Sequence, residues 1–436
     1  MAPARTWRRT AVAGVVAIAV AAGGWLWVRQ GEDHHESVTT AAGAYPAAFG
    51  SAPPDAPGRA IRRTADSYGV TGALSVDEIA DRDLHHDGVE AHDLRTGRSY
   101  WRYTRTGTDL DRVALSGTGD TVAVWWEDGL ITGLDVRTGT PRWRQKLSYG
   151  DLPGDSGGIA DLRMSGGLVL AQRRADLTAY DAASGKKKWT AELPEGCGQT
   201  YGMVRLMAKT VVAEGMCGKP QENQLFGFDE QSGALRWKLA DKFRSLRPAD
   251  DHTLVSSMWT DEGTGATVDV SGAKPAVTTF SAGPDFPAVA AGGGILLCSD
   301  NSPQNRQHEG ALAAFGLTDH RQRWTAQAAE GLRYGRPLLV GDRVYVVQQP
   351  TRVELDDDLK PRFDRYDARL VVIDAATGRQ LSSTPVPPPT PDSSWNQVGS
   401  DSELAPQQAT SGVVTVAWEG TGLISSVIND LSVMGR

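Results

Sequence analysis

The sequence predicts an all-β fold in which a unit of about four short strands repeats around a closed ring. Two observations predict it. A turn motif recurs along the chain, with neighbouring copies mostly about 40 to 48 residues apart, and short apolar or alternating runs precede each copy. Repeats of this length that contain several strands are typical of β-propellers, in which each repeat forms one radial sheet, or blade. We therefore expect a β-propeller.

The recurring motif has the form D-x-x-[T/S]-G-x-x-x-W. Four copies are complete: Asp93–Trp101, Asp135–Trp143, Asp181–Trp189 and Asp229–Trp237. Three copies are eroded: Asp269–Gly272 is shortened, Gly316–Trp324 loses the glycine, and Asp374–Leu381 loses the tryptophan. The residues expected to build the repeat turns are Asp93, Gly97, Trp101, Asp135, Gly139, Trp143, Asp181, Gly185, Trp189, Asp229, Gly233, Trp237, Trp324, Asp374 and Gly378.

Each residue type in the motif has a local physical reason. The aspartate carboxylate can accept hydrogen bonds from the backbone N–H groups of a tight turn. Glycine adopts the positive φ that a Cβ atom would penalise. The tryptophan lies on the strand after the turn and can pack its ring against a neighbouring sheet, which contributes about 3 kcal/mol or less by burial. The motif therefore predicts a fixed turn followed by the last strand of a blade.

Two predicted strands precede most of the turns, as Val122–Trp126 and Leu130–Leu134 do for the second copy. The C-terminus is different, because Val413–Trp418 and Leu423–Val427 form a predicted hairpin with no motif after it. This hairpin is either an incomplete eighth blade or it closes the first blade across the termini. The chain length from Gly72 onward, divided by the repeat length, favours eight blades, with seven as the alternative.

The N-terminus predicts a membrane anchor. Residues 1–10 are basic, and residues 11–28 carry no charged side chain, which indicates a single-pass transmembrane signal anchor with a cytoplasmic N-terminus. The alternative is a signal peptide cleaved after Ala19-Val20-Ala21. Residues 29–70 show no periodicity and are expected to form a flexible linker before the propeller domain at 71–436. The predicted location is the cell membrane, with the propeller on the extracytoplasmic side.

The repeat resembles the tryptophan-docking motif of the quinoprotein alcohol dehydrogenase-like propellers, whose PQQ-like repeats follow the pattern A-x-D-x-x-T-G-x-x-x-W. The four copies that end at Trp101, Trp143, Trp189 and Trp237 carry the resemblance. The eroded copies extend it from about Gly72 to the end of the chain. The chain is also similar to a propeller lipoprotein of the outer-membrane assembly machinery, but no cysteine follows the apolar N-terminal run to accept a lipid.

Catalysis by the resembling enzymes implies pyrroloquinoline quinone on the propeller axis, held by two adjacent cysteines, a calcium ion and an aspartate base. This chain has three cysteines, Cys197, Cys217 and Cys298, and none are adjacent. Two polar clusters, His85–Asp87 and Asp356–Asp358, are interpreted as solvated loop residues. No catalytic, cofactor-binding or metal-binding residue is therefore predicted, and no cofactor is expected.

The net charge of -8 argues against a nucleic-acid partner, because phosphate binding needs a basic surface. The predicted function is a non-catalytic scaffold that binds a protein or ligand at the cell envelope. Two alternatives stay open: a quinoprotein-like oxidoreductase and a small-ligand sensor.

Cys197 and Cys217 lie in glycine-rich segments that flank a predicted strand of the fourth repeat. Outside the cytoplasm we expect a disulfide between them, which would contribute about 2–4 kcal/mol, with Cys298 left as a free thiol.

Three connections between predicted strands are enlarged: Met216–Gln224, Asp300–Gly310 and Gln349–Arg369. In a propeller they would all open on one rim of the ring, and long loops inside a compact repeat are often functional. We predict that this rim contacts a partner, with Phe363 and Tyr366 as candidate anchors. The alternative is that these loops are tolerated insertions.

Overall fold

A computed structural model describes residues 35–435 except 51–52, 65–66, 81–85, 116–119, 148–159, 174, 219–221, 241–242, 259–263, 282–287, 300–309, 352–365, 389–402 and 420–430. The secondary structure of the described residues consists of β-strands and turns. Among them no helix is long and apolar enough to cross a membrane. The anchor predicted at 11–28 lies outside the described residues.

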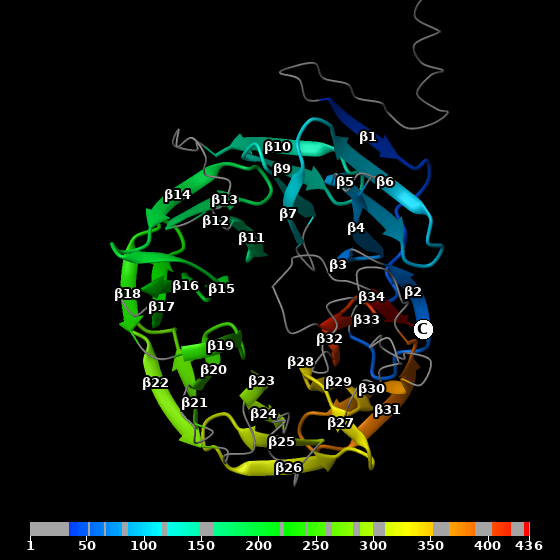
Figure 1. The fold of residues 1–436 in the computed structure, drawn as a ribbon, viewed down its shortest axis with the longest axis vertical. Helices are drawn as coiled ribbons and strands as arrows, with labels where there is room; N and C mark the ends of the chain where they lie inside the picture. Colours follow the sequence, from blue (N-terminus) through cyan, green and yellow to red (C-terminus); the bar gives the residue numbers. More distant parts are fainter. Residues whose placement is uncertain are drawn as a thin grey trace, which may run out of the picture.

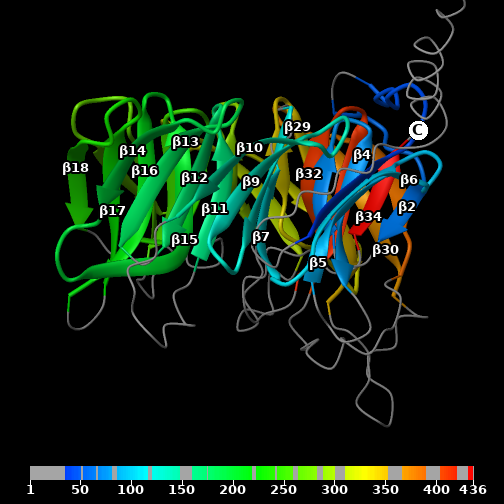
Figure 2. The same ribbon diagram turned by 90° about the horizontal axis from the view of Figure 1, so that it is seen from above.

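Eight antiparallel sheets surround a common axis, which confirms the all-β, eight-bladed propeller (Figure 1). Blades 1 to 7 are numbered by the turn motif that each contains, and blade 8 is the C-terminal sheet. In blades 2 to 6 the first strand lies nearest the axis and the last strand lies on the outside, whereas in blades 1 and 8 a strand from the N-terminal segment lies outermost (Figure 1). Seen from above, the blades stand side by side and their strands run between two rims (Figure 2).

The strands have the following bounds. Blade 1 contains β3 (Ser67–Thr71), β4 (Leu74–Ala80), β5 (His86–Asp93), β6 (Ser99–Arg105) and the added strand β1 (Glu36–Thr40); blade 2 contains β7 (Leu110–Leu115), β8 (Thr121–Trp126), β9 (Leu130–Asp135) and β10 (Pro141–Lys146); blade 3 contains β11 (Ala160–Ser165), β12 (Leu168–Arg173), β13 (Asp176–Asp181) and β14 (Lys187–Glu192); blade 4 contains β15 (Cys197–Met207), β16 (Thr210–Cys217), β17 (Glu222–Asp229) and β18 (Leu235–Ala240).

Blade 5 contains β19 (Phe243–Pro248), β20 (Thr253–Met258), β21 (Thr264–Asp269) and β22 (Ala276–Ser281); blade 6 contains β23 (Ala288–Gly292), β24 (Ile295–Ser299), β25 (Ala311–Gly316) and β26 (Gln322–Gln327); blade 7 contains β27 (Leu332–Tyr334), β28 (Leu338–Val340), β29 (Arg343–Pro350), β30 (Ala368–Asp374) and β31 (Gln380–Val386); blade 8 contains β32 (Glu403–Thr410), β33 (Val413–Glu419), β34 (Leu431–Gly435) and β2 (Ala60–Thr64).

The two rims differ in the length of their connections. The motif rim carries the turns after the third strand of blades 1 to 7, and these turns have nearly constant length, as in 136–140, 182–186 and 375–379. The opposite rim carries the connections between the second and third strands. These range from 174–175 in blade 3 to 351–367 in blade 7. The lengths of the repeats therefore differ mainly at the opposite rim.

The hydrophobic core consists of eight clusters, one between each pair of neighbouring blades. Successive side chains of a strand point to opposite faces of its sheet, so each blade packs against the blade on either side. Between blades 1 and 2, for example, Trp101, Tyr103 and Trp126 are fully buried. The cluster between blades 8 and 1 is the smallest and includes Phe49 and Ile61 from the N-terminal segment.

Blade 8 closes the ring with strands from both ends of the chain. Its three inner strands, β32, β33 and β34, come from the C-terminus, and its outer strand β2 comes from the N-terminus (Figure 1). The C-terminal segment is thus an eighth blade that the N-terminal strand completes. The strand predicted at 423–427 lies outside the described residues.

The prediction of a flexible linker at 29–70 is wrong for the described residues. Residues 35–50 and 53–64, here called the N-terminal strap, contain β1 and β2 and wrap around the outside of the ring. β1 pairs with β6 of blade 1, and Glu36 forms an ion pair with Arg144 of blade 2. The propeller therefore begins with the strap, well before the predicted boundary at residue 71.

Between β1 and β2 the N-terminal strap is held by blades 1, 8 and 7 in turn. Gly50 N donates to Ser411 O of blade 8 at 3.0 Å. In blade 7, Tyr345 Oη donates to Pro54 O at 3.0 Å, and Arg343 Nε lies 2.6 Å from Asp55 Oδ1. The proline-rich composition that suggested a flexible segment instead suits an extended chain whose hydrogen bonds are made by the neighbouring blades.

Candidate functional site

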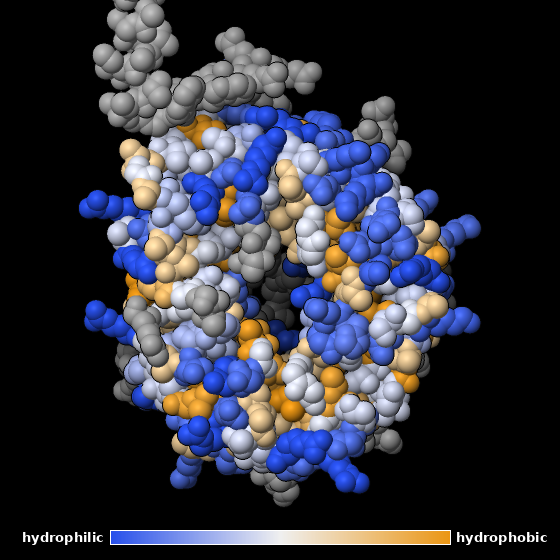
Figure 3. Space-filling view, turned by 180° about the vertical axis from the view of Figure 1, so that it is seen from behind, coloured by the Kyte–Doolittle hydropathy of each residue, from blue (hydrophilic) through white to orange (hydrophobic). Residues whose placement is uncertain are grey.

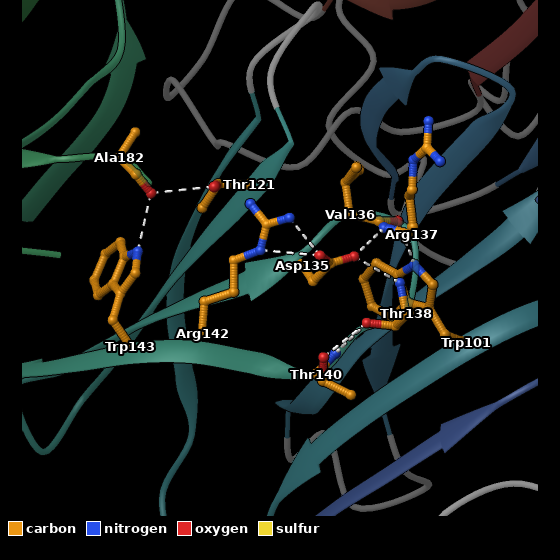
Figure 4. A network of polar contacts seen from close by, with 10 residues as sticks. All are labelled: Trp101, Thr121, Asp135, Val136, Arg137, Thr138, Thr140, Arg142, Trp143 and Ala182. Carbon is orange, nitrogen blue, oxygen red and sulfur yellow. Dashed lines mark hydrogen bonds and ion pairs between the residues drawn. The ribbon is translucent and has the colours of Figure 1, made fainter. Parts of the chain in front are cut away.

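The motif aspartates build their turns as the sequence predicted. In the second copy, Arg137 N and Thr138 N donate to Asp135 Oδ1 at 2.8 and 3.1 Å, and the Arg142 side chain donates to Asp135 Oδ2 (Figure 4). The motif glycine, Gly139, has φ 68° and donates its N–H to Asp135 O at 2.8 Å. The same glycine-to-aspartate backbone bond recurs in the copies at Gly97, Gly185, Gly233 and Gly378.

Hydrogen bonds from residues of these turns stabilise the ionised form of the motif aspartates. Hydrogen bonds from Ser184 lower the pKa of Asp181, and those from Ser232 lower the pKa of Asp229. The hydroxyl and amide of Thr377 lower the pKa of Asp374 in the same way. The cause is general, because a carboxylate that accepts several hydrogen bonds is stabilised in its charged form.

The tryptophans dock each blade onto the next. Trp143 of blade 2 donates its indole N–H to the carbonyl of Ala182 in the turn of blade 3, at 2.9 Å (Figure 4). The equivalent bonds run from Trp101 to Val136, from Trp189 to Glu230 and from Trp324 to Ala375, each at 2.8 Å. In each of these bonds the acceptor is the residue after the motif aspartate.

Small residues make room for each indole ring on both sides. Trp143 lies against Gly133 of its own blade and Gly185 of the next blade, and a Cβ atom added at either glycine would fall within 2.4 Å of the ring. Such an approach is far inside van der Waals contact, so both glycines are needed for close packing. The small residue two positions before the aspartate is thus part of the docking site.

The sixth copy replaces the motif residues in a compensated way. Asp319 takes the threonine position and accepts from Arg321 N at 3.1 Å, while Gly316 leaves the space that its carboxylate fills. His320 occupies the glycine position with φ 53° and lies 5.0 Å, ring to ring, from Phe280 of blade 5. A phenylalanine on a histidine therefore substitutes for the tryptophan on a glycine at this junction.

Among the described residues the indole bond is also absent from the junction of blades 4 and 5 and from that of blades 7 and 8. Trp237 of blade 4 faces the shortened copy of blade 5. Its indole N–H is buried without a hydrogen-bond partner among the described residues, although its ring lies in the same cluster as Val270. In blade 7 the tryptophan position is Ser382, whose hydroxyl donates to Asp55 O of the N-terminal strap at 3.0 Å. The strap thus takes the role of a docking contact where the tryptophan is missing.

Cys197 and Cys217 are joined by a disulfide and face each other across β15 and β16, with Cα atoms 4.0 Å apart. Cys298 is a free, buried cysteine at the junction of blades 5 and 6, and burial raises the pKa of its thiol to about 12. A thiol with such a pKa is a weak nucleophile, so Cys298 acts as a core residue.

The structure corrects one of the two predicted partner anchors. Tyr366 is 6% exposed, and its hydroxyl donates to Gln349 Oε1 between blades 7 and 8. Gln349 in turn donates to Leu404 O at 3.0 Å. Tyr366 is therefore a buried residue of the interblade core. Phe363 lies outside the described residues.

Two of the three enlarged connections are shorter in the structure than the sequence predicted. Most of Met216–Gln224 belongs to β16 and β17, which pair as far as Cys217 and Glu222. Both ends of Gln349–Arg369 are likewise strand residues, in β29 and β30. Residues 300–309 lie outside the described residues. Regular pairing thus continues further towards the opposite rim than the sequence suggested.

One described turn of the opposite rim is fixed by a buried ion pair that the sequence reading missed. Arg105 of blade 1 makes two hydrogen bonds to Asp128 of blade 2, at 2.9 and 2.8 Å. Burial raises the pKa of Asp128, but the bonds from Arg105, the Leu130 amide and Lys146 outweigh it and hold this pKa well below its ordinary value. The short turn at 127–129 is therefore rigid.

A polar cluster between blades 1 and 8 was also missed. His92 Nδ1 lies 2.8 Å from Asp77 Oδ2, and the Ser75 hydroxyl lies 3.3 Å from the same oxygen. A serine nucleophile would have to bond the histidine that activates it. Here serine bonds the aspartate, so the arrangement differs from that of a serine activated by histidine. Among the described residues no group of three or more His, Cys, Asp or Glu side chains could hold a metal ion.

Of three comparisons with known proteins, only one gives a match in sequence. A family model described as outer membrane protein assembly factor BamB matches residues 85–244 and 221–425. No curated protein matches the sequence. Solved structures that resemble the chain include BamB from Moraxella catarrhalis, with 13% identity over 86% of this chain and 99% of that chain and a TM-score of 0.49. Quinohemoprotein alcohol dehydrogenase from Comamonas testosteroni has 15% identity over 89% of this chain and 77% of that chain, with a TM-score of 0.43.

Assignment to a family rests on the sequence match, because it includes part of every blade and all four complete copies of the turn motif. Only β1 to β4 and β34 lie outside it. The chain therefore belongs to the family of PQQ-like β-propellers whose model is described as outer membrane protein assembly factor BamB.

Proposed function

We propose that this chain is a protein-binding scaffold of the cell envelope, without catalytic activity, that contacts its partner through the opposite rim. Residues 11–28 anchor it in the membrane in this proposal, with the propeller on the extracytoplasmic side. Family membership supports a protein partner, since the matching model is described as an assembly factor. The Cys197–Cys217 disulfide supports an oxidising, extracytoplasmic compartment.

The observation that carries the proposal is the difference between the two rims. The motif rim consists of turns of nearly constant length whose polar groups are used in the turns and in tryptophan docking. The opposite rim carries the connections that differ from blade to blade. Variable loops on a rigid scaffold are where binding residues are usually found, so the opposite rim is the better candidate for a partner.

Photo-crosslinking in intact cells tests this proposal. A photo-reactive residue would be placed at the opposite rim, at Asp176 or Gly218, and for comparison at the motif rim of the same blades, at Ala183 or Gln231. All four positions are exposed. We expect one discrete protein adduct from the opposite-rim positions and none from the motif rim. Equal adducts from both rims, or none from either, would reject the opposite rim as the binding face.

A further inference from the structure

Three arginines recur at one position of the innermost strands in consecutive blades. Arg163, Arg205 and Arg247 are evenly spaced along the chain. Each lies on the first strand of its blade, β11, β15 or β19, and pairs with the third residue of the second strand. The three arginines therefore stand at the same level of the axial wall, in blades 3, 4 and 5. We call them the arginine row.

The three side chains also point in the same direction. The residues before them, Leu162, Val204 and Leu246, pack into the junction with the preceding blade. Because successive side chains of a strand alternate between its two faces, the arginines point away from that junction. Arg163 is 49% exposed, Arg205 is exposed and Arg247 is half-buried.

Solvent-exposed side chains on an innermost strand face the axis or a rim, because the other strands of the blade lie outside it. Figure 3 shows that the ring is hollowed at its axis and that hydrophilic and hydrophobic residues both border the hollow. The arginine row thus lies on a wall that a ligand can reach from solvent.

The local charge is positive on a chain whose net charge is -8. The three strands contain four arginines and a single acidic residue, Asp161. Asp161 lies 3.0 Å from Arg163, and no acidic partner of Arg205 is found among the described residues. Guanidinium groups prefer carboxylate and phosphate ligands, which they bind through two parallel hydrogen bonds.

We propose that the arginine row binds an extended acidic peptide of a protein partner, with carboxylates at alternate positions. The spacing favours this ligand. Neighbouring innermost strands, β11 with β15 and β15 with β19, approach each other within 8 Å between Cα atoms. An extended peptide presents alternate side chains on one face about 6.8 Å apart. Successive carboxylates can therefore meet arginines of successive blades. This inference rests on the proposed function, because it assumes a protein partner.

Fluorescence anisotropy with a labelled peptide in which glutamate alternates with serine tests the arginine row at physiological ionic strength. The triple variant Arg163→Gln, Arg205→Gln, Arg247→Gln should bind it at least about tenfold more weakly than the natural chain. The matched control is Lys186→Gln, Lys187→Gln, Lys188→Gln, which removes the same charge from the exposed outer side of blade 3. It should change the affinity by less than about twofold.

Three results would overturn the proposal. The first is equal binding of a peptide with glutamine in place of glutamate. The second is an equal loss of affinity in the lysine control, since the effect would then be one of net charge. The third is binding of free citrate to the arginine row without binding of the peptide, which would indicate a small anion instead. Circular dichroism and thermal unfolding would verify that both triple variants fold.

The same measurements separate this inference from the proposed function. Peptide binding that depends on the arginine row, without any adduct from the opposite rim in cells, would support the peptide site and reject the opposite rim as the binding face. Adducts from the opposite rim that persist in the triple arginine variant, together with no peptide binding, would support the opposite rim as the binding face and reject the arginine row as a peptide site.

Discussion

At the scale of single residues, the turn motif joins two functions in nine positions. Its aspartate and glycine fix a turn within one blade, while its tryptophan and the backbone carbonyl after the aspartate fix the next blade. The exceptions serve the same two functions, because Asp319 accepts the hydrogen bond of the turn and the contact of Phe280 with His320 replaces that of tryptophan with glycine. The motif therefore holds the junction between blades as well as the turn.

The indole hydrogen bond can be isolated by comparing two tryptophans of equal burial. Trp189 and Trp237 are both 6% exposed, but only Trp189 has a partner for its N–H among the described residues. We expect Trp189→Phe to reduce the free energy of unfolding by about 1 kcal/mol more than Trp237→Phe, because it alone leaves a carbonyl unpaired. Urea denaturation of both variants measures the difference. Equal losses would show that ring packing accounts for the whole effect.

The motif carboxylates predict how stability depends on acid. The pKa values of Asp181, Asp229 and Asp374 are below their ordinary value of 3.8 in the folded chain. Their contribution to the free energy of unfolding is therefore complete above the ordinary pKa. It is lost as the pH falls from there towards the lower pKa values of the folded chain. We expect the melting temperature to fall steeply below about pH 4, and less steeply in Asp229→Asn. Asp176→Asn, an exposed aspartate outside the motif, should keep the original slope.

At the scale of elements, the blades could be predicted because their signal is local and repeated. A turn with its own carboxylate and glycine, flanked by apolar runs, specifies a strand pair wherever it occurs, and seven of the eight blades contain a complete or eroded copy of such a turn. The N-terminal strap has no comparable signal. Its hydrogen bonds go to blades 7, 8 and 1, which are distant in sequence, so its composition indicated only an irregular segment.

Tyr366 was misread for a related reason. It stands at the end of a long connection between strands, where exposed residues are usual, yet it is buried by contacts with Gln349 and blade 8. No periodicity in the sequence marks a single buried residue of this kind. The arginine row has a regular spacing, but it was visible only when pairing placed the three residues at one level.

Truncation distinguishes the N-terminal strap from the outer strand of blade 8. Removal of residues 1–58 deletes β1 and the contacts to Arg343 and Tyr345 but keeps β2. We expect this chain to melt at least about 3 °C below one that lacks only residues 1–34, since several hydrogen bonds and an ion pair are lost. Scanning calorimetry of the two purified chains gives the comparison. Identical melting temperatures would mean that the strap does not stabilise the closed ring.

At the scale of the whole molecule, the ring separates stability from recognition. The eight interblade clusters, the tryptophan docking and the N-terminal strap hold the blades together, and the motif rim is largely occupied by these contacts. The opposite rim and the arginine row lie outside this set. Substitutions there should leave folding intact, because exposed residues away from caps, cores and buried pairs usually change stability by less than about 0.5 kcal/mol.

The two predicted anchors test this separation within one connection of blade 7. Tyr366→Phe removes a buried hydrogen bond to Gln349 and should lower the free energy of unfolding by about 1 kcal/mol, without reducing the adduct formed from Gly218 in cells. Phe363→Ala, if Phe363 contacts the partner as we propose, should do the reverse and leave stability unchanged while the adduct disappears. Urea denaturation and the yield of adduct are measured on the same two variants. An unchanged adduct in Phe363→Ala would remove that residue from the binding face, because the Tyr366 variant shows how little the adduct depends on a modest loss of stability.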